Sequence, residues 1–145
     1  MSAGRICSRV TATAWPTETV RDAAERMAEN DVGTLVVVDP DGANRAVGIV
    51  TDRDVAIRCV GGGLDPVSTP VSAIMTAQVH SVDEETSIED ALARMAKAGT
   101  RRLVVTGRRG EMVGILSLDD VLGLLTQETA SIGRLLEKQE PHIPG

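Results

Sequence analysis

A chain of 145 residues with 42% hydrophobic residues is long enough to bury a core without disulfides or a structural metal. Its formal net charge of −6 disfavours generic nucleic-acid binding, because no basic field would attract phosphates. It contains no run of about 18 apolar residues and no apolar signal-peptide region near its N-terminus, so we expect a cytoplasmic protein that neither spans nor binds a membrane.

The first predicted elements are a lead-in segment and an amphipathic helix. Residues 6–16 form a loose lead-in with little periodicity. Thr19 is a favourable N-cap with Asp22 three residues later, close to a capping-box pattern. Apolar residues recur at helical spacing over 20–28, which predicts a helix that ends near residues 30–33.

A hairpin and a second helix follow. Residues 34–38 are a β-branched run typical of a buried strand, and residues 39–42 are typical of a turn. Residues 46–50 complete the predicted hairpin. Thr51 then opens a helix, which the glycines at 61–63 end.

The second half repeats this order of elements. Ser87 caps a predicted helix, residues 102–106 and 111–116 form a second hairpin, and Ser117 opens the last helix. Helical periodicity continues towards the C-terminus, so residues 129–139 are either a dimerisation helix or a solvated tail, with a frayed end beyond them.

One motif occurs in both halves. Gly48-x-x-Thr51-x-x-Asp54 recurs 66 residues later as Gly114-x-x-Ser117-x-x-Asp120. Segments upstream of it recur at a spacing of 68, and a two-residue deletion in the second hairpin loop explains the difference. Helical, strand and glycine signals recur in one order, which indicates a duplicated unit.

The duplication predicts an α+β protein in which two βαββα units pack through their sheets with pseudo-twofold symmetry. We assign residues 6–62 and 74–126 to the two units, 63–73 to a linker and 127–145 to a C-terminal helix or tail. The rows to be covered between the sheets are Leu35 with Val37 and Leu103 with Val105. Covering such a face contributes several kcal/mol at about 25 cal/mol per Å².

The tandem units resemble a pair of CBS domains, also called a Bateman module, over roughly residues 6–126. Met75-Thr76 matches the usual lead-in of such a unit, whereas Cys7-Ser8 departs from it. The linker at 63–66 further resembles stand-alone bacterial proteins of the hypoxic response type. The resemblance implies a homodimeric regulatory protein, not an enzyme, that binds AMP, ADP or ATP between its units, requires no cofactor and acts on an unidentified protein.

Helix starts of this kind suit a nucleoside phosphate. Thr51 and Ser117 lie at predicted N-caps, where a hydroxyl can donate to phosphate and the helix dipole favours an anion. Asp54 and Asp120 are better matched to ribose, because a carboxylate can accept from both sugar hydroxyls. The glycine of each motif allows close backbone approach. The same residues are also an ordinary capping pattern, so capping alone is the competing interpretation.

Further candidate contacts complete the predicted site. Ile49 and Ile115 would contact adenine, and Val79 and Thr11 would supply backbone contacts from equivalent lead-in segments. The candidates for phosphate binding are Arg53, Arg101 and Arg102. Because Gly33 and Thr34 occupy the positions in the first unit that match Arg101 and Arg102, we expect two unequal clefts, with the better anion site near these arginines. The alternative is that the arginines are solvated surface charges.

The remaining residues give little sign of metal or catalytic chemistry. Cys7 and Cys59 are interpreted as reduced thiols, with a redox disulfide as the alternative. His80 and His142 lack metal-ligand spacing with them, so no metal site is predicted. Ser117 has no base nearby in sequence. The alternative function is a ligand-independent dimerisation or interaction scaffold.

Overall fold

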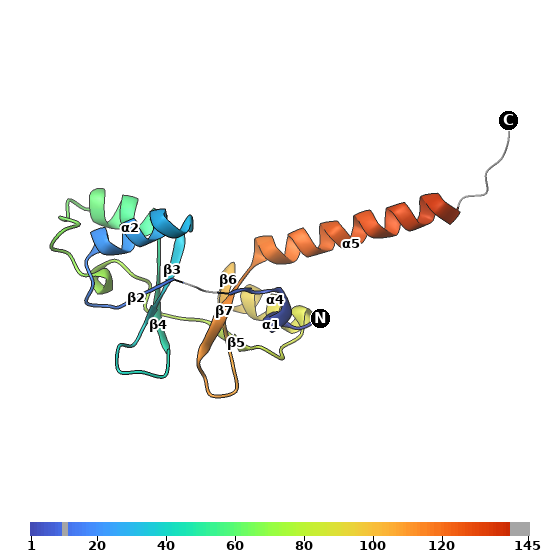
Figure 1. Cartoon of the computed structure of the whole chain (residues 1–145), viewed down its shortest axis with the longest axis horizontal. Helices are drawn as coiled ribbons and strands as arrows, with labels where there is room; N and C mark the ends of the chain where they lie inside the picture. The colour runs from blue at the N-terminus through green and yellow to red at the C-terminus, as the bar shows by residue number, and fades with distance from the viewer. Residues whose placement is uncertain (10–11, 140–145) are drawn as a thin grey trace.

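Two small sheets form the centre of the protein. The structure is a computed structural model that describes residues 1–9 and 12–139. One sheet has the order β2-β3-β4 and the other β1-β7-β6-β5 (Figure 1). The strands are β1 (Ser8–Arg9), β2 (Thr13–Ala14), β3 (Thr34–Val38), β4 (Ala46–Thr51), β5 (Ser81–Asp83), β6 (Arg102–Thr106) and β7 (Met112–Ser117). In each sheet the central hairpin is antiparallel and the short lead-in strand β2 or β5 pairs in parallel.

Helices connect and flank these strands. They are α1 (Ala3–Ile6), α2 (Val20–Asn30), α3 (Asp52–Asp54), α4 (Ile88–Ala98) and α5 (Leu118–Gln139). A π-helix, η1 (Val55–Val60), continues α3, and a 3₁₀ turn, η2 (Val71–Ala73), precedes the second unit. The predicted α+β class and the βαββα order of each unit are confirmed.

Local signals set the ends of α2 and α4, and both starts lie where the sequence predicts them. The Thr19 hydroxyl accepts from the Asp22 amide at 3.1 Å at the start of α2. Ser87 accepts in the same way from the Asp90 amide at 3.1 Å at the start of α4. The helices end where the backbone turns left-handed, at Asp31 (φ 53°) and at Gly99 (φ 67°). Glycine adopts this conformation without a steric penalty.

The two hairpins share one register, as a duplication requires. Val37 pairs with Gly48 in the first, and Val105 pairs with Gly114 in the second. Both ladders become irregular directly after these pairs, at the end where the two hairpin loops differ in length. The repeat inferred from the sequence therefore extends to hydrogen-bonded partners.

The prediction of which residues lie between the sheets was wrong. Leu35 and Val37 pack beneath α2 with Ala23 and Met27, and their counterparts in the second unit pack beneath α4. The residues between the sheets come from the opposite faces, with Val36 and Val38 meeting Val104 and Met112. Alternate residues of a strand point to opposite faces, and both faces of β3 are apolar, so the sequence pattern could not distinguish them.

The lead-in segments cross over to the opposite unit, which the sequence did not suggest. β1 pairs with β7 of the second unit, and the amides of Ala3 and Gly4 donate to the carbonyls of Thr86 and Glu84. In return Thr76 pairs with Ile49 of the first unit. The first part of each lead-in thus packs on the other unit's sheet, whereas β2 and β5 pair within their own unit, so the two units are interlocked.

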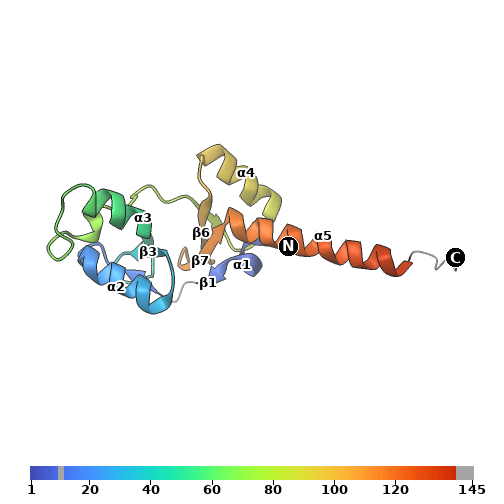
Figure 2. The same cartoon turned by 90° about the horizontal axis from the view of Figure 1, so that it is seen from above.

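The two units differ most at their last helices. In the first, the motif is followed by one turn of α-helix and then by η1. In the second, α5 runs for 22 residues and extends away from the sheets (Figures 1 and 2). Within the described residues no helix is long and apolar enough to cross a membrane.

Candidate functional site

Two clefts open between the units, one at each copy of the repeated motif. The Ser117 cleft has a volume of about 300 Å³, and the Thr51 cleft about 230 Å³. The Ser117 cleft is lined by Ser8, Arg9 and Ala12 of the first lead-in, by Val32–Thr34, by Arg102, and by Ile115, Ser117, Asp119 and Asp120. The Thr51 cleft is lined by Ile49, Thr51 and Asp54, by Thr76, Gln78 and His80 of the second lead-in, and by Thr100 and Arg102.

Both motifs form reciprocal capping boxes. The Asp54 amide donates to Thr51 Oγ1 at 3.1 Å, and the Thr51 amide donates to Asp54 Oδ2 at 2.9 Å. The second copy repeats this, with the Asp120 amide to Ser117 Oγ at 3.1 Å and the Ser117 amide to Asp120 Oδ2 at 3.2 Å. These residues therefore do cap their helices, as the competing interpretation predicts.

Capping leaves part of each motif free for a ligand. A hydroxyl that accepts from an amide still has a proton to donate, and a carboxylate that accepts through Oδ2 still has Oδ1. The amides at the Thr51 motif are occupied, because the Asp52 amide donates to the Gly33 carbonyl and the Arg53 amide to Asp52 Oδ1. An anion there would depend on side chains more than on helix amides.

The free carboxylate oxygen differs between the clefts. Asp54 Oδ1 lies 3.6 Å from the Nε of Arg58, one turn further along the chain. The position that matches Arg58 in the second unit is Leu124, which carries no charge. Asp120 Oδ1 therefore lacks the counterpart of the arginine that pairs with Asp54.

The basic residues are also distributed unequally. Arg102 lines both clefts, whereas Arg9 lines only the Ser117 cleft. Arg9 donates to the Gly4 carbonyl at 3.3 Å. Arg101 lies outside the described lining of both clefts and pairs at 3.5 Å with Asp119, both side chains being largely exposed. Arg53 is exposed and also lies outside both linings.

The motif glycines are close to protein backbone. A Cβ on Gly114 would lie 2.4 Å from the Ser8 carbonyl oxygen and 2.9 Å from the Cys7 sulfur. A Cβ on Gly48 would lie 2.6 Å from the Met75 sulfur and 3.1 Å from the Thr76 carbonyl oxygen. Neither glycine is in the described lining of a cleft. The structure thus gives both glycines a packing role, which is to admit the crossed lead-in.

The apolar candidates separate into two groups. Ile49 and Ile115 each line the cleft beside their own motif. Val79 instead packs between the sheets, in the cluster that contains Val36 and Val104, and lies outside both described linings. Thr11 lies outside the described residues.

Sequence reasoning missed three titratable residues that line the clefts, besides several polar ones. Arg9 belongs to the segment interpreted as a loose lead-in, and Asp119 is one of the unspecified positions of the repeated motif. His80 was considered only as a metal ligand. The repeat register contained a signal for two of them. His80 matches Ala12 in the other copy, and Arg9 matches Ala77, so each cleft receives its own residue from the equivalent lead-in.

The two cysteines lie in the interior of the protein. Cys7 and Cys59 are free and buried, and burial raises the pKa of the Cys7 thiol above its ordinary value. Among the residues that the structure describes, no group of three or more His, Cys, Asp or Glu side chains could hold a metal ion.

Comparison with known proteins gives these clefts a context. The family model described as "CBS domain" matches residues 3–61 and 71–127. The chain is 30% identical over 143 residues to the uncharacterized protein MK0525 of Methanopyrus kandleri, covering 99% of this chain and 72% of that protein. It is 33% identical over 104 residues to hypoxic response protein 1 of Mycobacterium tuberculosis, covering 72% and 71%.

Solved structures of similar fold belong to the same kind of protein as the sequence relatives. A crystal structure of Hypoxic Response Protein I with two coordinated zinc ions matches with a TM-score of 0.71 at 30% identity, covering 84% of this chain and 97% of that one. The CBS domain protein PAE2072 from Pyrobaculum aerophilum, complexed with AMP, matches with a TM-score of 0.73 at 28% identity, covering 87% and 99%.

Proposed function

Because the chain belongs to the CBS-domain family and carries two tandem CBS domains, we propose that it is a regulatory module that binds an adenine nucleotide between them. The observation that carries this proposal is the combination present in each cleft, a hydroxyl, a carboxylate and Arg102 at one open surface. The AMP bound to PAE2072 supports the choice of ligand. We propose AMP, ADP or ATP as ligand, with no required cofactor and no catalytic step.

The Ser117 cleft is the stronger of the two sites in this proposal. Arg9 and Arg102 would neutralise phosphate charge, and the free Oδ1 of Asp120 would accept from the ribose hydroxyls. Ile115 and the half-exposed Val32 offer apolar contact for adenine, since no aromatic residue lines this cleft. The Thr51 cleft has a single arginine and a carboxylate already paired with Arg58.

Arg102 connects the two sites. It is one side chain in the lining of both clefts, so a phosphate that binds it from one side removes it from the other. We therefore expect one nucleotide per chain to bind tightly and a second to bind more weakly. With two unequal affinities, the protein would respond over a wider range of nucleotide concentrations than with two equal sites.

The regulatory output requires two states with different affinity for the nucleotide. We propose that the protein acts as a homodimer in the cytoplasm and that the ligand changes its assembly or its affinity for a regulated protein. The hexameric CBS-CP12 protein from bloom-forming cyanobacteria, 29% identical to this chain, shows that such pairs assemble in a relative.

A ligand-independent scaffold is the second candidate function. Its specific support is that all four motif side chains already satisfy their own backbone in the capping boxes. A scaffold needs nothing further from those residues. It predicts that no adenine nucleotide stabilises the protein.

Titration calorimetry and thermal unfolding with adenosine, AMP, ADP and ATP separate the two functions. Ligand at 100 times Kd should raise the unfolding free energy by about 2.7 kcal/mol. Arg9→Ala should weaken ATP about tenfold and leave adenosine unchanged, because Arg9 is assigned to phosphate. Ala77→Arg, at the matching position of the other lead-in, is the reciprocal variant and should strengthen the weaker site. Absence of any shift at millimolar ligand would support the scaffold.

A further inference from the structure

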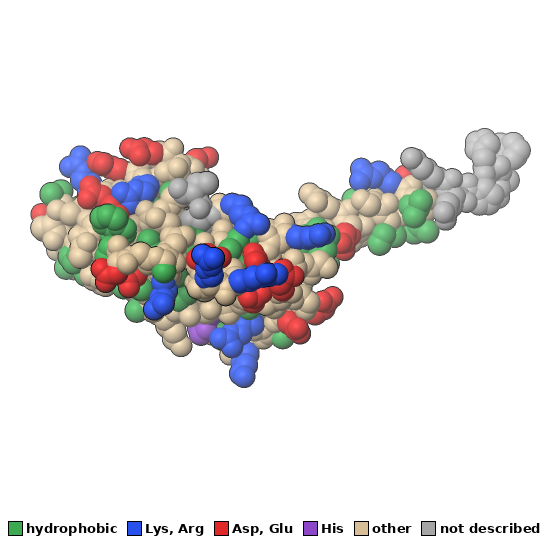
Figure 3. Space-filling model, turned by 60° about the horizontal axis from the view of Figure 1, so that its bottom comes forward, with side chains coloured by type: hydrophobic (Ala, Val, Ile, Leu, Met, Phe, Trp, Pro, Cys, Tyr) green, Lys and Arg blue, Asp and Glu red, His purple; other side chains and the backbone are tan. Residues whose placement is uncertain are grey.

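The outer part of α5 carries an apolar face that nothing in the described structure covers. Every residue from Leu125 to Glu137 is exposed, and the helix extends away from both units (Figures 1 and 2). Ile132, Leu135 and Leu136 are each 56–59% exposed, and Leu122 and Leu125 are each 47–48% exposed. Hydrophobic side chains are visible on the outer helix in Figure 3.

The spacing of these residues matches a coiled-coil seam. Leu122, Leu125, Thr129, Ile132 and Leu136 follow one another at alternating steps of three and four residues. The one polar member, Thr129, donates its hydroxyl to the Leu125 carbonyl at 2.9 Å, so it can present its methyl group to an apolar partner. Thr126 is satisfied in the same way by the Leu122 carbonyl. We call Leu122, Leu125, Thr129, Ile132 and Leu136 the α5 seam.

The composition of the outer helix does not favour an isolated helix. Thr126, Thr129 and Gly133 are weak helix formers, and helices shorter than about 12–15 residues are marginal in water even in better sequences. Helical stability at such a site comes from packing of the apolar face. We therefore expect a partner that covers this apolar face to stabilise the outer part of α5.

We propose that the partner is the α5 seam of a second copy of this chain, packed antiparallel. The first half of α5 carries three acidic residues, Asp119, Asp120 and Glu128, whereas in the second half Arg134 and Glu137 cancel each other. Antiparallel packing therefore keeps the two acidic halves apart, whereas parallel packing would place them side by side. The antiparallel arrangement also opposes the two helix dipoles and places the two pairs of CBS domains at opposite ends. A membrane surface fits less well, because helices that lie on membranes carry many basic residues on the polar face.

This inference gives a specific surface to the homodimer proposed above, and it can fail separately from nucleotide binding. Ile132→Asp with Leu136→Asp places two charges on the seam four residues apart. Gln127→Asp with Ser131→Asp is the matched control, with the same charges and spacing on another face of the helix. Light scattering after size exclusion gives the mass of each full-length protein, circular dichroism gives its helix content, and calorimetry gives nucleotide affinity.

We expect the seam variant to have half the mass of the wild type, a dimer dissociation constant raised about 100-fold or more, and less helix signal, because buried charges oppose pairing. The control should keep the mass and the helix signal. A seam variant that keeps the wild-type mass would place the dimer on another surface, and a monomeric wild type would overturn both the seam and the homodimer. Nucleotide binding that persists in either case leaves the ligand proposal standing.

Spin labels test the orientation. Glu128→Cys labels should lie within roughly 10–15 Å of each other across the pair, since paired helices are about 8–10 Å apart. Glu137→Cys labels should be separated by roughly 20–30 Å in an antiparallel pair, at about 1.5 Å per residue. Short distances at both positions would overturn the antiparallel arrangement.

Discussion

The two copies of the repeated motif have the same backbone hydrogen bonds and different surroundings. Both form a capping box, and both place their glycine under the crossed lead-in of the other unit. They differ in the side chains beside the motif. Arg58 in the first unit matches Leu124 in the second, and Arg9 in the first lead-in matches Ala77 in the second. The capping boxes are thus common to both copies, and in our proposal the neighbouring side chains determine which cleft binds an anion more tightly.

The largest expected effect comes from the two glycines. Gly114→Ala would force a Cβ to 2.4 Å from the Ser8 carbonyl, which is backbone held in the β1–β7 pairing. Gly48→Ala would mainly meet the flexible Met75 side chain at 2.6 Å. We expect losses of about 3 kcal/mol and about 1 kcal/mol respectively in the free energy of unfolding, because backbone cannot move aside as a side chain can.

Urea denaturation with an unchanged m-value measures this difference. Gly123→Ala is the control, because nothing lies within 4 Å of the added Cβ and the exposed helix should gain up to about 1 kcal/mol. Equal losses of unfolding free energy in Gly48→Ala and Gly114→Ala would show that both lead-ins are held equally firmly. The two units would then not differ in this respect.

The next effect concerns the two carboxylates. Asp120→Asn and Asp54→Asn each keep an acceptor for the capping amide and remove the charge. We expect Asp120→Asn to weaken the tighter nucleotide site, in the Ser117 cleft, about tenfold. Because Asp54 is already paired with Arg58, Asp54→Asn should weaken the site in its own Thr51 cleft less than about threefold. Titration calorimetry with AMP measures both.

Exchanging the residue next to a carboxylate tests whether the pair with Arg58 causes the difference between the clefts. Leu124→Arg should create in the second unit the pair that Arg58 forms in the first, and should weaken the tighter site about threefold. Leu124 is partly exposed, so a longer side chain can be accommodated there. An unchanged affinity in Leu124→Arg would mean that a factor other than the free Asp120 oxygen distinguishes the clefts.

Features set by local chemistry could be predicted from the sequence. Thr19 and Ser87 identified the starts of α2 and α4, and the twice-repeated motif indicated two related clefts. Each depends on a few neighbouring residues whose preferences are strong. The resemblance to CBS domains rested on the same residues, and the family match confirms it.

Features set by long-range packing could not be predicted. β3 is apolar on both faces, so nothing in the pattern indicated that Val36 rather than Leu35 would lie between the sheets. The crossing of the lead-ins brings Arg9 beside Ser117, more than 100 residues away in sequence, and only the fold reveals it. The same holds for Arg102, whose presence in both clefts depends on how the units are placed.

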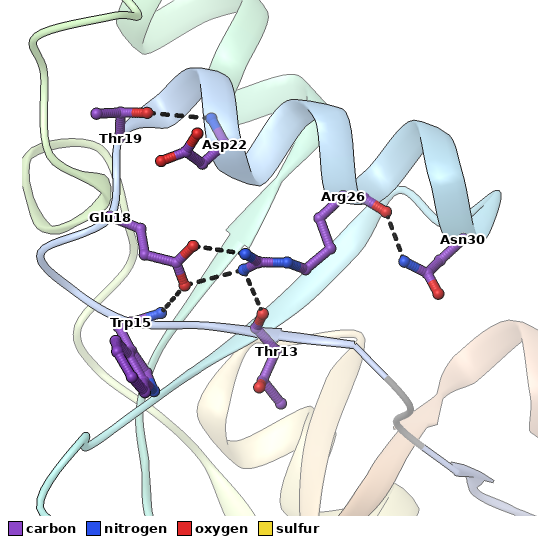
Figure 4. Close-up of polar contacts among 7 residues, drawn as sticks. All are labelled: Thr13, Trp15, Glu18, Thr19, Asp22, Arg26 and Asn30. Atoms are coloured by element: carbon purple, nitrogen blue, oxygen red, sulfur yellow. Dashed lines mark hydrogen bonds and ion pairs between the residues drawn. The ribbon is translucent and has the colours of Figure 1, made fainter.

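The smallest expected effect comes from a contact that only the first unit has. Glu18 forms a two-point ion pair with Arg26, at 2.9 and 2.6 Å, and also accepts from the Trp15 amide (Figure 4). Arg26 in turn donates to the Thr13 carbonyl at 2.7 Å, so the pair fastens β2 to α2. The matching residues of the second unit are Thr86 and Arg94, which cannot form such a pair.

Hydrogen bonding from Arg26 lowers the pKa of Glu18 below its ordinary value. A carboxyl whose pKa is lower in the folded state stabilises the fold above its unfolded pKa, and this contribution is lost as the pH falls through the folded pKa. Glu18→Gln should therefore cost about 0.5 kcal/mol near pH 7, and the difference from wild type should shrink as the solution is acidified below the ordinary range of glutamate. Glu25→Gln, which removes an exposed pair with Arg21, should cost almost nothing at any pH. Urea unfolding across the acid range measures both variants, and a Glu18→Gln difference that does not change with pH would show that the side chain acts through packing rather than charge.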